Sequence, residues 1–261
     1  MSLKSGVKSA IAVAWDAGSR LSRPAPKLTI LYYHAVPAAQ AAAFDTQMAY
    51  LKRTANIVAP DHTGPLAIDR PNVAVTFDDA FRSVRENALP ALARHGVPAT
   101  IYVPTGNLGR QPGWRMETSG DRDEVVMTAE EIAALPSDLI AIGSHTVSHP
   151  HLTKLSDEEV GEQFGASRAA LEGLLGRTID TLAFPYGDHD ARVVELARQA
   201  GYRFVYTVAP QAIAAGDTAT SRGRTGADPG DAPGLFALKT RGAFDWMPMA
   251  SSLKRRLRPR S

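Results

Sequence analysis

The chain has 261 residues, of which 44% are hydrophobic and 21% are charged, and its formal net charge is +2. This length and composition are typical of a globular protein with a substantial core, in one large α/β domain or two small ones. The near balance of charge gives no indication of nucleic acid as a partner. Because cysteine is absent, disulfides, a thiolate nucleophile and Cys-ligated zinc are all excluded.

The two ends of the chain differ from its middle. Residues 1–26 are expected to form an N-terminal helix or a flexible segment, because the apolar stretch Ala10–Trp15 is short for a signal peptide and Asp16 follows it at once. Residues 246–261 form a basic tail that carries Lys254, Arg255, Arg256, Arg258 and Arg260. Such a tail fits either a solvated segment or a contact with a membrane surface. No apolar run reaches the length of about 18 residues that spans a bilayer, so a cytoplasmic location, or one peripheral to a membrane, is favoured.

Residues 27–245 are expected to form the main domain. In chain order, its predicted elements are a strand at 28–33, a helix at 41–55, a strand at 73–77, a helix at 84–94, a strand at 99–103, a helix opened by a capping box at 128–131, a strand at 139–143, a helix at 156–176, a strand at 181–184, a helix at 190–201, and strands at 204–208 and 236–240. The segments 104–127 and 209–234 are expected to be loops. Strands that alternate with helices predict an α/β fold with a parallel sheet or barrel, in which active sites form at the carboxyl ends of the strands.

The strand at 73–77 ends in two adjacent carboxylates, Asp78 and Asp79. Adjacent side chains on a strand point in opposite directions, so the two carboxylates can serve different tasks. The simpler alternative is that one of them caps the following helix, since Asp is favoured at that position. The pair alone does not decide between these alternatives.

Two histidines four positions apart, His145 and His149, follow the strand at 139–143. Such a pair can bind one cation from a tight turn, and Pro150 favours a turn over a continued helix. One Asp and two His supply three ligands and leave positions open, which is the layout of a catalytic metal site. The second Asp is then free to act as a general base that activates water. Two histidines exposed on the surface are the alternative.

Three short motifs resemble those of a known family. Thr76–Ala80 is similar to the TFDD motif of the polysaccharide deacetylases, the NodB-homology group of carbohydrate esterase family 4. His145–Pro150 resembles the second motif of that family, and Phe184–Gly187 resembles the third. The order and spacing of the three motifs make a chance match implausible, and the chain is identified by this resemblance as a member.

The resemblance implies a distorted (β/α) barrel of about seven parallel strands. It implies a hydrolase that removes N-acetyl groups from N-acetylhexosamine units of a polysaccharide or glycan. Asp78 would be the catalytic base, and the backbone N–H of Tyr186 would stabilise the oxyanion. Asp79, His145 and His149 would bind a divalent metal, for which zinc is the expected ion.

Two departures from the family pattern concern the base and the acid. The third motif usually carries an Arg that orients the base, but Ala183 stands at that position, and Arg222 or Arg224 could supply the missing group. The usual late histidine that serves as catalytic acid is also absent. His34 ends the first strand, as in the circularly permuted deacetylases that process poly-N-acetylglucosamine. We therefore expect His34 to be the general acid, although a histidine without a chemical role would fit the same position.

The substrate is expected to contact the third motif and one aromatic side chain of the long loop. The residues concerned are Phe184, Pro185, Tyr186 and Trp114. Trp114 could stack on a sugar ring or could anchor the loop to the core. Two alternative functions are compatible with the same residues. One is an esterase that removes O-acetyl groups from carbohydrate, and the other is a glycan-binding protein whose catalytic site has decayed.

Overall fold

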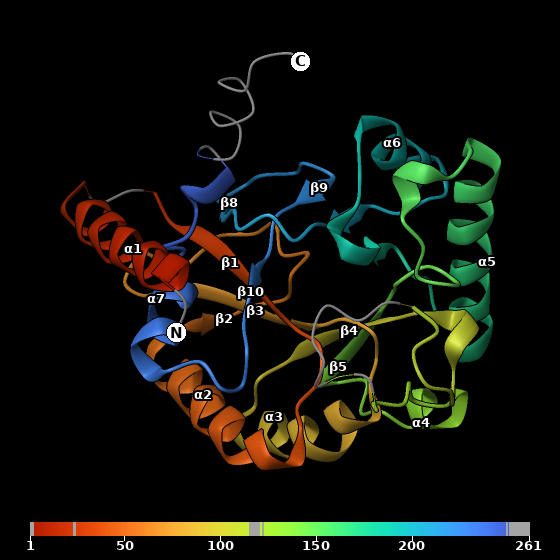
Figure 1. The fold of residues 1–261 in the computed structure, drawn as a ribbon, viewed down its shortest axis with the longest axis horizontal. Helices are drawn as coiled ribbons and strands as arrows, with labels where there is room; N and C mark the ends of the chain where they lie inside the picture. The colour runs from red at the N-terminus through yellow and green to blue at the C-terminus, as the bar shows by residue number, and fades with distance from the viewer. Residues whose placement is uncertain (1–2, 23–24, 115–120, 122, 249, 251–261) are drawn as a thin grey trace.

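The computed structural model describes residues 3–22, 25–114, 121, 123–248 and 250, and its strands form one sheet that curves into a nearly closed barrel (Figure 1). The strands are β1 (Lys27–Tyr33), β2 (Asn56–Ile57), β3 (Asn72–Phe77), β4 (Ala99–Val103), β5 (Ile140–Ser144), β6 (Thr181–Ala183), β7 (Phe204–Tyr206), β8 (Ile213–Ala214), β9 (Ser221–Arg222) and β10 (Thr225–Gly226). Their order along the sheet is β10-β1-β3-β4-β5-β6-β7-β9, and all neighbours on this path pair in parallel.

One short segment closes the barrel. Residues 221–222 pair with β7, and residues 225–226 pair with β1, so a continuous stretch of chain joins the two edges of the sheet. Gly223 lies at the crossing, where an added Cβ would approach the Ala209 carbonyl oxygen to 2.5 Å. A larger residue there would therefore collide with the chain that follows β7.

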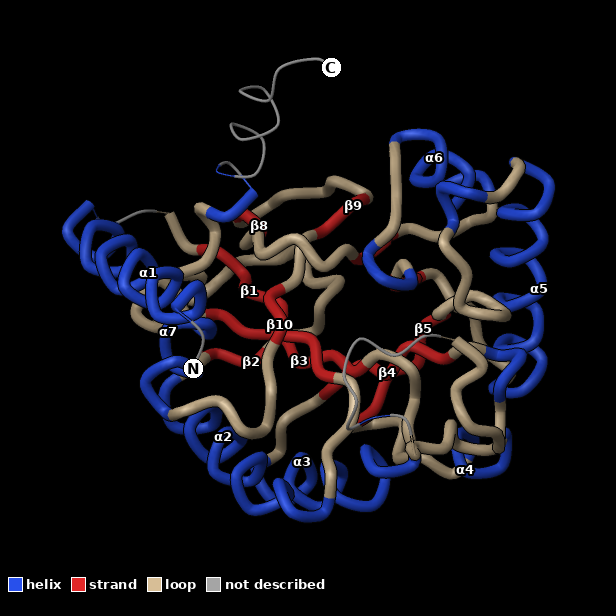
Figure 2. Tube along the Cα trace, in the orientation of Figure 1, coloured by secondary structure: helices blue, strands red, loops and turns tan. Residues whose placement is uncertain are grey.

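Helices surround the strands on the outside of the barrel (Figure 2). The α-helices are α1 (Leu3–Ser22), α2 (Ala41–Thr54), α3 (Leu89–His95), α4 (Ala129–Ala133), α5 (Asp157–Leu175), α6 (Ala191–Gln199) and α7 (Pro233–Thr240). Shorter helical turns lie at Ala38–Gln40, Val84–Ala88, Thr105–Asn107, Leu152–Lys154 and Pro185–Gly187. Within the ranges described, no helix is both long enough and apolar enough to cross a membrane.

The helix ends follow the expected local chemistry. Thr128 and Ser156 each form a capping box, in which the hydroxyl accepts from the backbone N–H of a glutamate three residues later. The helix α5 ends at Gly176, whose φ of 63° is left-handed and favours glycine. These caps confirm the predicted starts of α4 and α5 and the predicted end of α5.

Six predicted strands are confirmed, namely β1, β3, β4, β5, β6 and β7. The strand predicted at 236–240 is wrong, because those residues lie in α7. Pro233 occupies the first turn of that helix, where its missing N–H costs nothing, and Phe236 and Thr240 lie one turn apart on the buried side. The segment 209–234 also contains β8, β9 and β10, which are two residues long and too short to produce a periodic pattern.

Alternate residues of the strands enter two separate cores. In β1 and β3, Leu31 and Val75 pack outward against the helices in the larger core. Ile30 and Ala74 point into the barrel, where they share a smaller core with Tyr102 and Tyr206. The interior positions of β3 are therefore 74 and 76, and Asp78 continues the same alternation.

Arg222 holds the amino-terminal end of the barrel together. Its guanidinium group donates to the carbonyl oxygens of Pro60 at 2.8 Å, His62 at 3.1 Å and Asp217 at 2.9 Å. It also lies 4.0 Å from the ring centroid of Phe204, the first residue of β7. Arg222 is 1% exposed, so these carbonyl groups take the place of water around its charge.

We expect the substitution Arg222→Met to lower the free energy of unfolding by about 3 kcal/mol, because buried hydrogen bonds from a charged group are lost. Urea unfolding followed by circular dichroism measures the change. Arg198→Met is the control, since Arg198 pairs with Glu195 on an exposed stretch of α6 and should change stability by less than about 0.5 kcal/mol. Equal effects of the two substitutions would contradict this account of Arg222.

Candidate active site

Backbone strain in the described residues is concentrated in the three motif segments. The non-glycine residues with positive φ are Asp79 (67°), Ala80 (50°), Thr146 (69°), His149 (57°) and Tyr186 (57°). A left-handed conformation costs an ordinary residue about 1–2 kcal/mol. Strain of this kind persists where the surrounding structure holds it, and it is common at functional sites. The carboxyl ends of β3, β5 and β6 therefore form one strained rim.

Three potential metal ligands meet at this rim. The Nε2 atoms of His145 and His149 lie 3.5 and 3.4 Å from Asp79 Oδ1. The ligand atoms of all three residues lie within 4.8 Å of one another, and the three side chains are buried. His151 is half-exposed and lies instead 3.8 Å from Asp188, outside this group.

The protonation of the two histidines suits a metal ion. The Nδ1 atom of His145 lies 2.7 Å from the Ala183 carbonyl oxygen, which can only accept, so Nδ1 carries the proton and Nε2 presents a lone pair. Burial lowers the pKa of His145 to about 4 and, together with His145, lowers the pKa of His149 to about 2. Neutral imidazole nitrogens that face a carboxylate oxygen favour a cation between them, and one aspartate with two histidines suits a divalent ion.

Asp78 lies beside this cluster and is paired with Arg224. The two guanidinium NH groups donate to the two carboxylate oxygens, each at 2.7 Å. Arg224 also donates to Thr76 Oγ1 at 3.2 Å and to the Thr207 carbonyl oxygen at 3.2 Å. Burial alone would raise the pKa of Asp78, but Arg224, with a smaller contribution from His145, lowers it to about 2. Asp78 is therefore an ionised acceptor with a fixed orientation.

The structure distinguishes between the two arginines named as substitutes for the missing motif arginine. Arg224 contacts Asp78, whereas Arg222 contacts the opposite end of the barrel. Arg224 is fully buried, and its guanidinium carbon lies 4.9 Å from the ring centroid of Tyr32 and 5.5 Å from that of Tyr102. These aromatic rings stabilise the cation where water cannot reach it.

His34 lies on the neighbouring strand end. The N–H of Asp78 donates to the Tyr33 carbonyl oxygen at 2.9 Å, so the chain positions of His34 and Asp78 adjoin across the sheet. The His34 ring is half-buried and packs edge-on against Tyr32 at 5.7 Å. A positive charge on His34 would help to keep the pKa of Asp78 low. The structure thus brings His34 to the same rim as the motif residues.

The third motif presents one aromatic side chain to the histidines. The Tyr186 ring packs edge-on against His149 at 4.5 Å and stacks on His151 at 4.2 Å. Phe184 and Pro185 are buried, so contact of their side chains with a substrate is not expected. The positive φ of Tyr186 marks the sharp turn by which the chain leaves β6.

Trp114 and His189 also pack beside the motif residues. Trp114 stacks on His149, with ring centroids 4.5 Å apart and planes inclined by 23°, and it also packs against the larger core. His189 stacks on Phe184, and its Nδ1 lies 2.7 Å from the Gly187 carbonyl oxygen. Asp190 caps α6 by accepting from the Val193 N–H.

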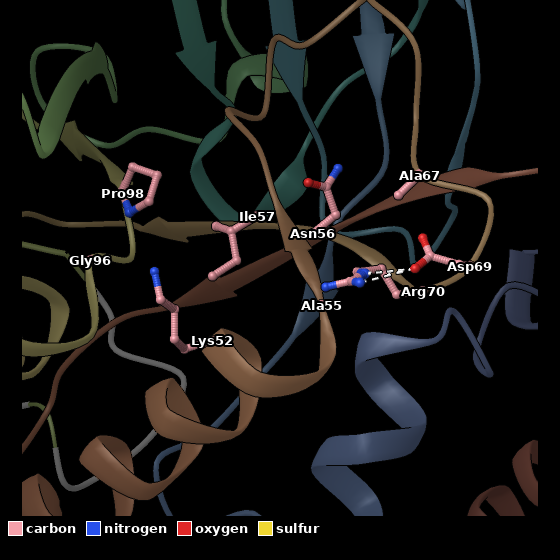
Figure 3. A pocket seen from close by; sticks show the side chains of 9 residues that line it. All are labelled: Lys52, Ala55, Asn56, Ile57, Ala67, Asp69, Arg70, Gly96 and Pro98. Carbon is pink, nitrogen blue, oxygen red and sulfur yellow. Dashed lines mark hydrogen bonds and ion pairs between the residues drawn. The ribbon is translucent and has the colours of Figure 1, made fainter.

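A surface pocket lies at the other end of the barrel. Figure 3 shows Lys52 of α2, Asn56 and Ile57 of β2, and the Asp69–Arg70 ion pair around it. Pro98, just before β4, completes the lining on the amino-terminal side of the strands. The motif residues do not contribute to this pocket, so it is separate from the rim on which the potential metal ligands meet.

Comparisons with known proteins agree with this geometry. The family model for polysaccharide deacetylases matches residues 67–205. The Bacillus subtilis protein YxkH is 22% identical over 208 residues, which cover 76% of this chain and 70% of that protein. The poly-beta-1,6-N-acetyl-D-glucosamine N-deacetylase of Staphylococcus aureus is 23% identical over 145 residues, which cover 54% of this chain and 49% of that protein. The chain therefore matches about half the length of this second relative.

A solved structure supports the fold. The structure of IcaB from Ammonifex degensii has a TM-score of 0.69 and 25% sequence identity, and the match covers 82% of this chain and 97% of that one. The matched family range starts after β1, so it includes the three motif segments and leaves His34 outside. Because that range is more than half of the sequence, the chain belongs to the polysaccharide deacetylase family.

Proposed function

We propose that this chain is a metal-dependent hydrolase that removes N-acetyl groups from N-acetylhexosamine units of a polysaccharide, within a domain that runs from residue 27 to 245. The observation that carries the proposal is the Arg224–Asp78 ion pair beside Asp79, His145 and His149. An oriented and ionised carboxylate next to a set of metal ligands is what hydrolysis of an unactivated amide requires.

Zinc is the proposed ion, held by Asp79, His145 and His149. Two imidazoles and a carboxylate are ligands that zinc accepts in catalytic sites. When bound, such an ion polarises the acetyl carbonyl group and lowers the pKa of water. The hydrogen bond from His145 Nδ1 to the Ala183 carbonyl oxygen holds that ligand's ring in the orientation it needs.

The remaining steps are assigned to side chains and backbone of this protein. Asp78 accepts a proton from the attacking water, and Arg224 keeps its carboxylate directed at the site. The backbone N–H of Tyr186 stabilises the oxyanion of the tetrahedral intermediate. His34 donates a proton to the leaving amine, because an amide nitrogen leaves readily only when it is protonated.

The proposed substrate is a chain of N-acetylglucosamine. The name of the Staphylococcus aureus relative supports this class, and the Tyr186 ring offers an aromatic surface at the rim. Trp114, stacked on His149, is the second aromatic group proposed to contact a sugar. A panel of N-acetyl and O-acetyl oligosaccharides, assayed for amine and acetate release, tests the proposed class against the O-acetyl esterase alternative.

Chelation should abolish the hydrolysis of N-acetylglucosamine oligomers, and added zinc should restore it. We expect His149→Ala to lower the zinc content of the purified protein, measured by elemental analysis, to well below one equivalent, since a ligand is lost. His151→Ala is the matched control, because His151 lies close by but outside the ligand set. Full zinc content and activity in His149→Ala would contradict the proposed site.

The roles of His34 and Asp78 can be separated by the leaving group. We expect His34→Gln to lower kcat/KM for an N-acetyl oligomer by about 100-fold or more and to leave hydrolysis of p-nitrophenyl acetate nearly unchanged, since nitrophenolate leaves without protonation. Asp78→Asn should reduce both reactions, because both need activated water. His189→Gln serves as the control histidine at the same rim. Equal losses in both reactions for His34→Gln would rule out a general acid at that position.

Removal of the Arg224 guanidinium should change the pH dependence of activity. In the native protein Asp78, with a pKa of about 2, is ionised throughout the usual assay range. Without Arg224, burial raises the pKa of Asp78. On acidification, the activity of Arg224→Met should therefore begin to fall at a higher pH than the activity of the native protein. We also expect kcat/KM at neutral pH to fall by about 100-fold, because the base loses its fixed orientation.

The control for this experiment is Arg222→Met, which removes a buried guanidinium at the other end of the barrel. Both variants should be less stable, but only Arg224→Met should change the pH profile of the folded protein. Arg224→Lys keeps the charge without the paired hydrogen bonds and should give an intermediate profile. An unchanged profile in Arg224→Met would show that Asp78 is not the base.

A further inference from the structure

The helix α1 directs apolar side chains toward solvent. Val7, Ile11 and Trp15 follow one another at intervals of four residues, so they form one stripe along the helix, and they are 56%, 41% and 38% exposed. Ala14 and Gly18 lie beside this stripe and are also exposed. A surface helix of a globular protein normally turns its apolar stripe toward the core. In α1 that arrangement is reversed.

The orientation of α1 is fixed by contacts on its inner side. Ala12 is fully buried in a small cluster with Leu238, Ala243 and Phe244. Asp16 accepts two hydrogen bonds from Arg241, at 2.9 and 3.0 Å. The pair is mostly shielded, with side-chain exposures of 12% for Asp16 and 23% for Arg241. A small residue and a salt bridge therefore hold the inner side, and the stripe is left outside.

The helix that carries the stripe is basic in sequence. Lys8 is exposed at its side, and the helix sequence also contains Lys4 and Arg20. Asp16 is the only acidic residue of α1, and Arg241 already neutralises it. The chain end that follows the cluster under α1 is also basic in sequence: Lys254, Arg255, Arg256, Arg258 and Arg260. An apolar stripe with an exposed lysine at its side, on a helix that is basic in sequence, matches the surface of a bilayer that contains anionic lipid.

We propose that the outer side of α1 docks on an anionic phospholipid surface, with Val7 and Ile11 inserted at the boundary of the acyl chains and Trp15 at the level of the headgroups. Trp suits this level because its ring is apolar and its N–H can reach water. A second copy of the chain fits less well, because a narrow stripe offers far less than the area of about 800 Å² per partner of a stable interface. Two basic helices would also repel each other.

The test is co-sedimentation of the full chain with vesicles of phosphatidylcholine containing 30% phosphatidylglycerol, compared with phosphatidylcholine alone. We expect binding to the anionic vesicles that weakens with salt. The double substitution Val7→Gln and Ile11→Gln should reduce the partition coefficient by about tenfold or more, because the inserted apolar area is lost. Ile68→Gln is the matched control, since Ile68 is 90% exposed but lies outside α1. Circular dichroism and deacetylase activity on a soluble oligomer should be unchanged in all variants.

Brominated lipid provides a second measurement, which is separate from the partition coefficient obtained by co-sedimentation. Quenching of tryptophan fluorescence should be strong in the native chain and should largely disappear in Trp15→Phe, a conservative change that keeps the helix apolar. No binding to anionic vesicles, or equal binding by the double variant, would overturn the proposal. A dimer in light scattering that the double variant converts to a monomer, without vesicle binding, would also overturn it and assign the stripe to a second copy.

Discussion

The ion pair between Arg224 and Asp78 joins the segment that closes the barrel to the end of β3, next to the potential metal ligand Asp79. Arg224 lies between β9 and β10, and Asp78 follows β3 directly. Both side chains are buried, so each would be strongly destabilising without the other. The same segment therefore closes the barrel and orients the Asp78 carboxylate. If the segment 221–226 left the edges of the sheet, Asp78 would lose its partner and its low pKa together.

Hydrogen bonds from Thr146 and from the helix α5 support the strained turn of the second motif. The His149 N–H donates to Thr146 Oγ1 at 3.1 Å, within the second motif. Gln163 of α5 accepts from the backbone N–H groups of Val147 and Ser148, at 3.1 and 3.0 Å. These contacts satisfy backbone groups that a left-handed turn would otherwise leave unbonded. The helix α5 therefore contributes to the position of His149 without touching the ligand cluster itself.

Features that depend on residues close together in the sequence could be predicted, and features that depend on tertiary contacts could not. The strands, the helix caps and the convergence of Asp79, His145 and His149 were predictable, because Asp79 and His145 come at the ends of parallel strands, such ends share one rim, and His149 follows His145 within one turn. The partner of Asp78 was not, since Arg222 and Arg224 are two residues apart in a segment without periodicity. Only the crossing at Gly223 separates them, by directing one arginine to each end of the barrel. Residues 236–240, which lie in α7, were predicted as a strand because a short buried apolar run fits both patterns.

The alanine at position 183 has a structural reason once Arg224 is considered. Ala183 lies in the interior cluster with Tyr102 and Tyr206, and it pairs with Tyr206 in the sheet. The guanidinium of Arg224 lies over the rings of the same two tyrosines, at 5.5 and 6.0 Å. A long cationic side chain at 183 would compete for this closed volume and would place like charges together where they cannot be solvated. The small residue at 183 and the arginine at 224 are thus complementary: Asp78 keeps a guanidinium partner, supplied by the closing segment instead of the third motif.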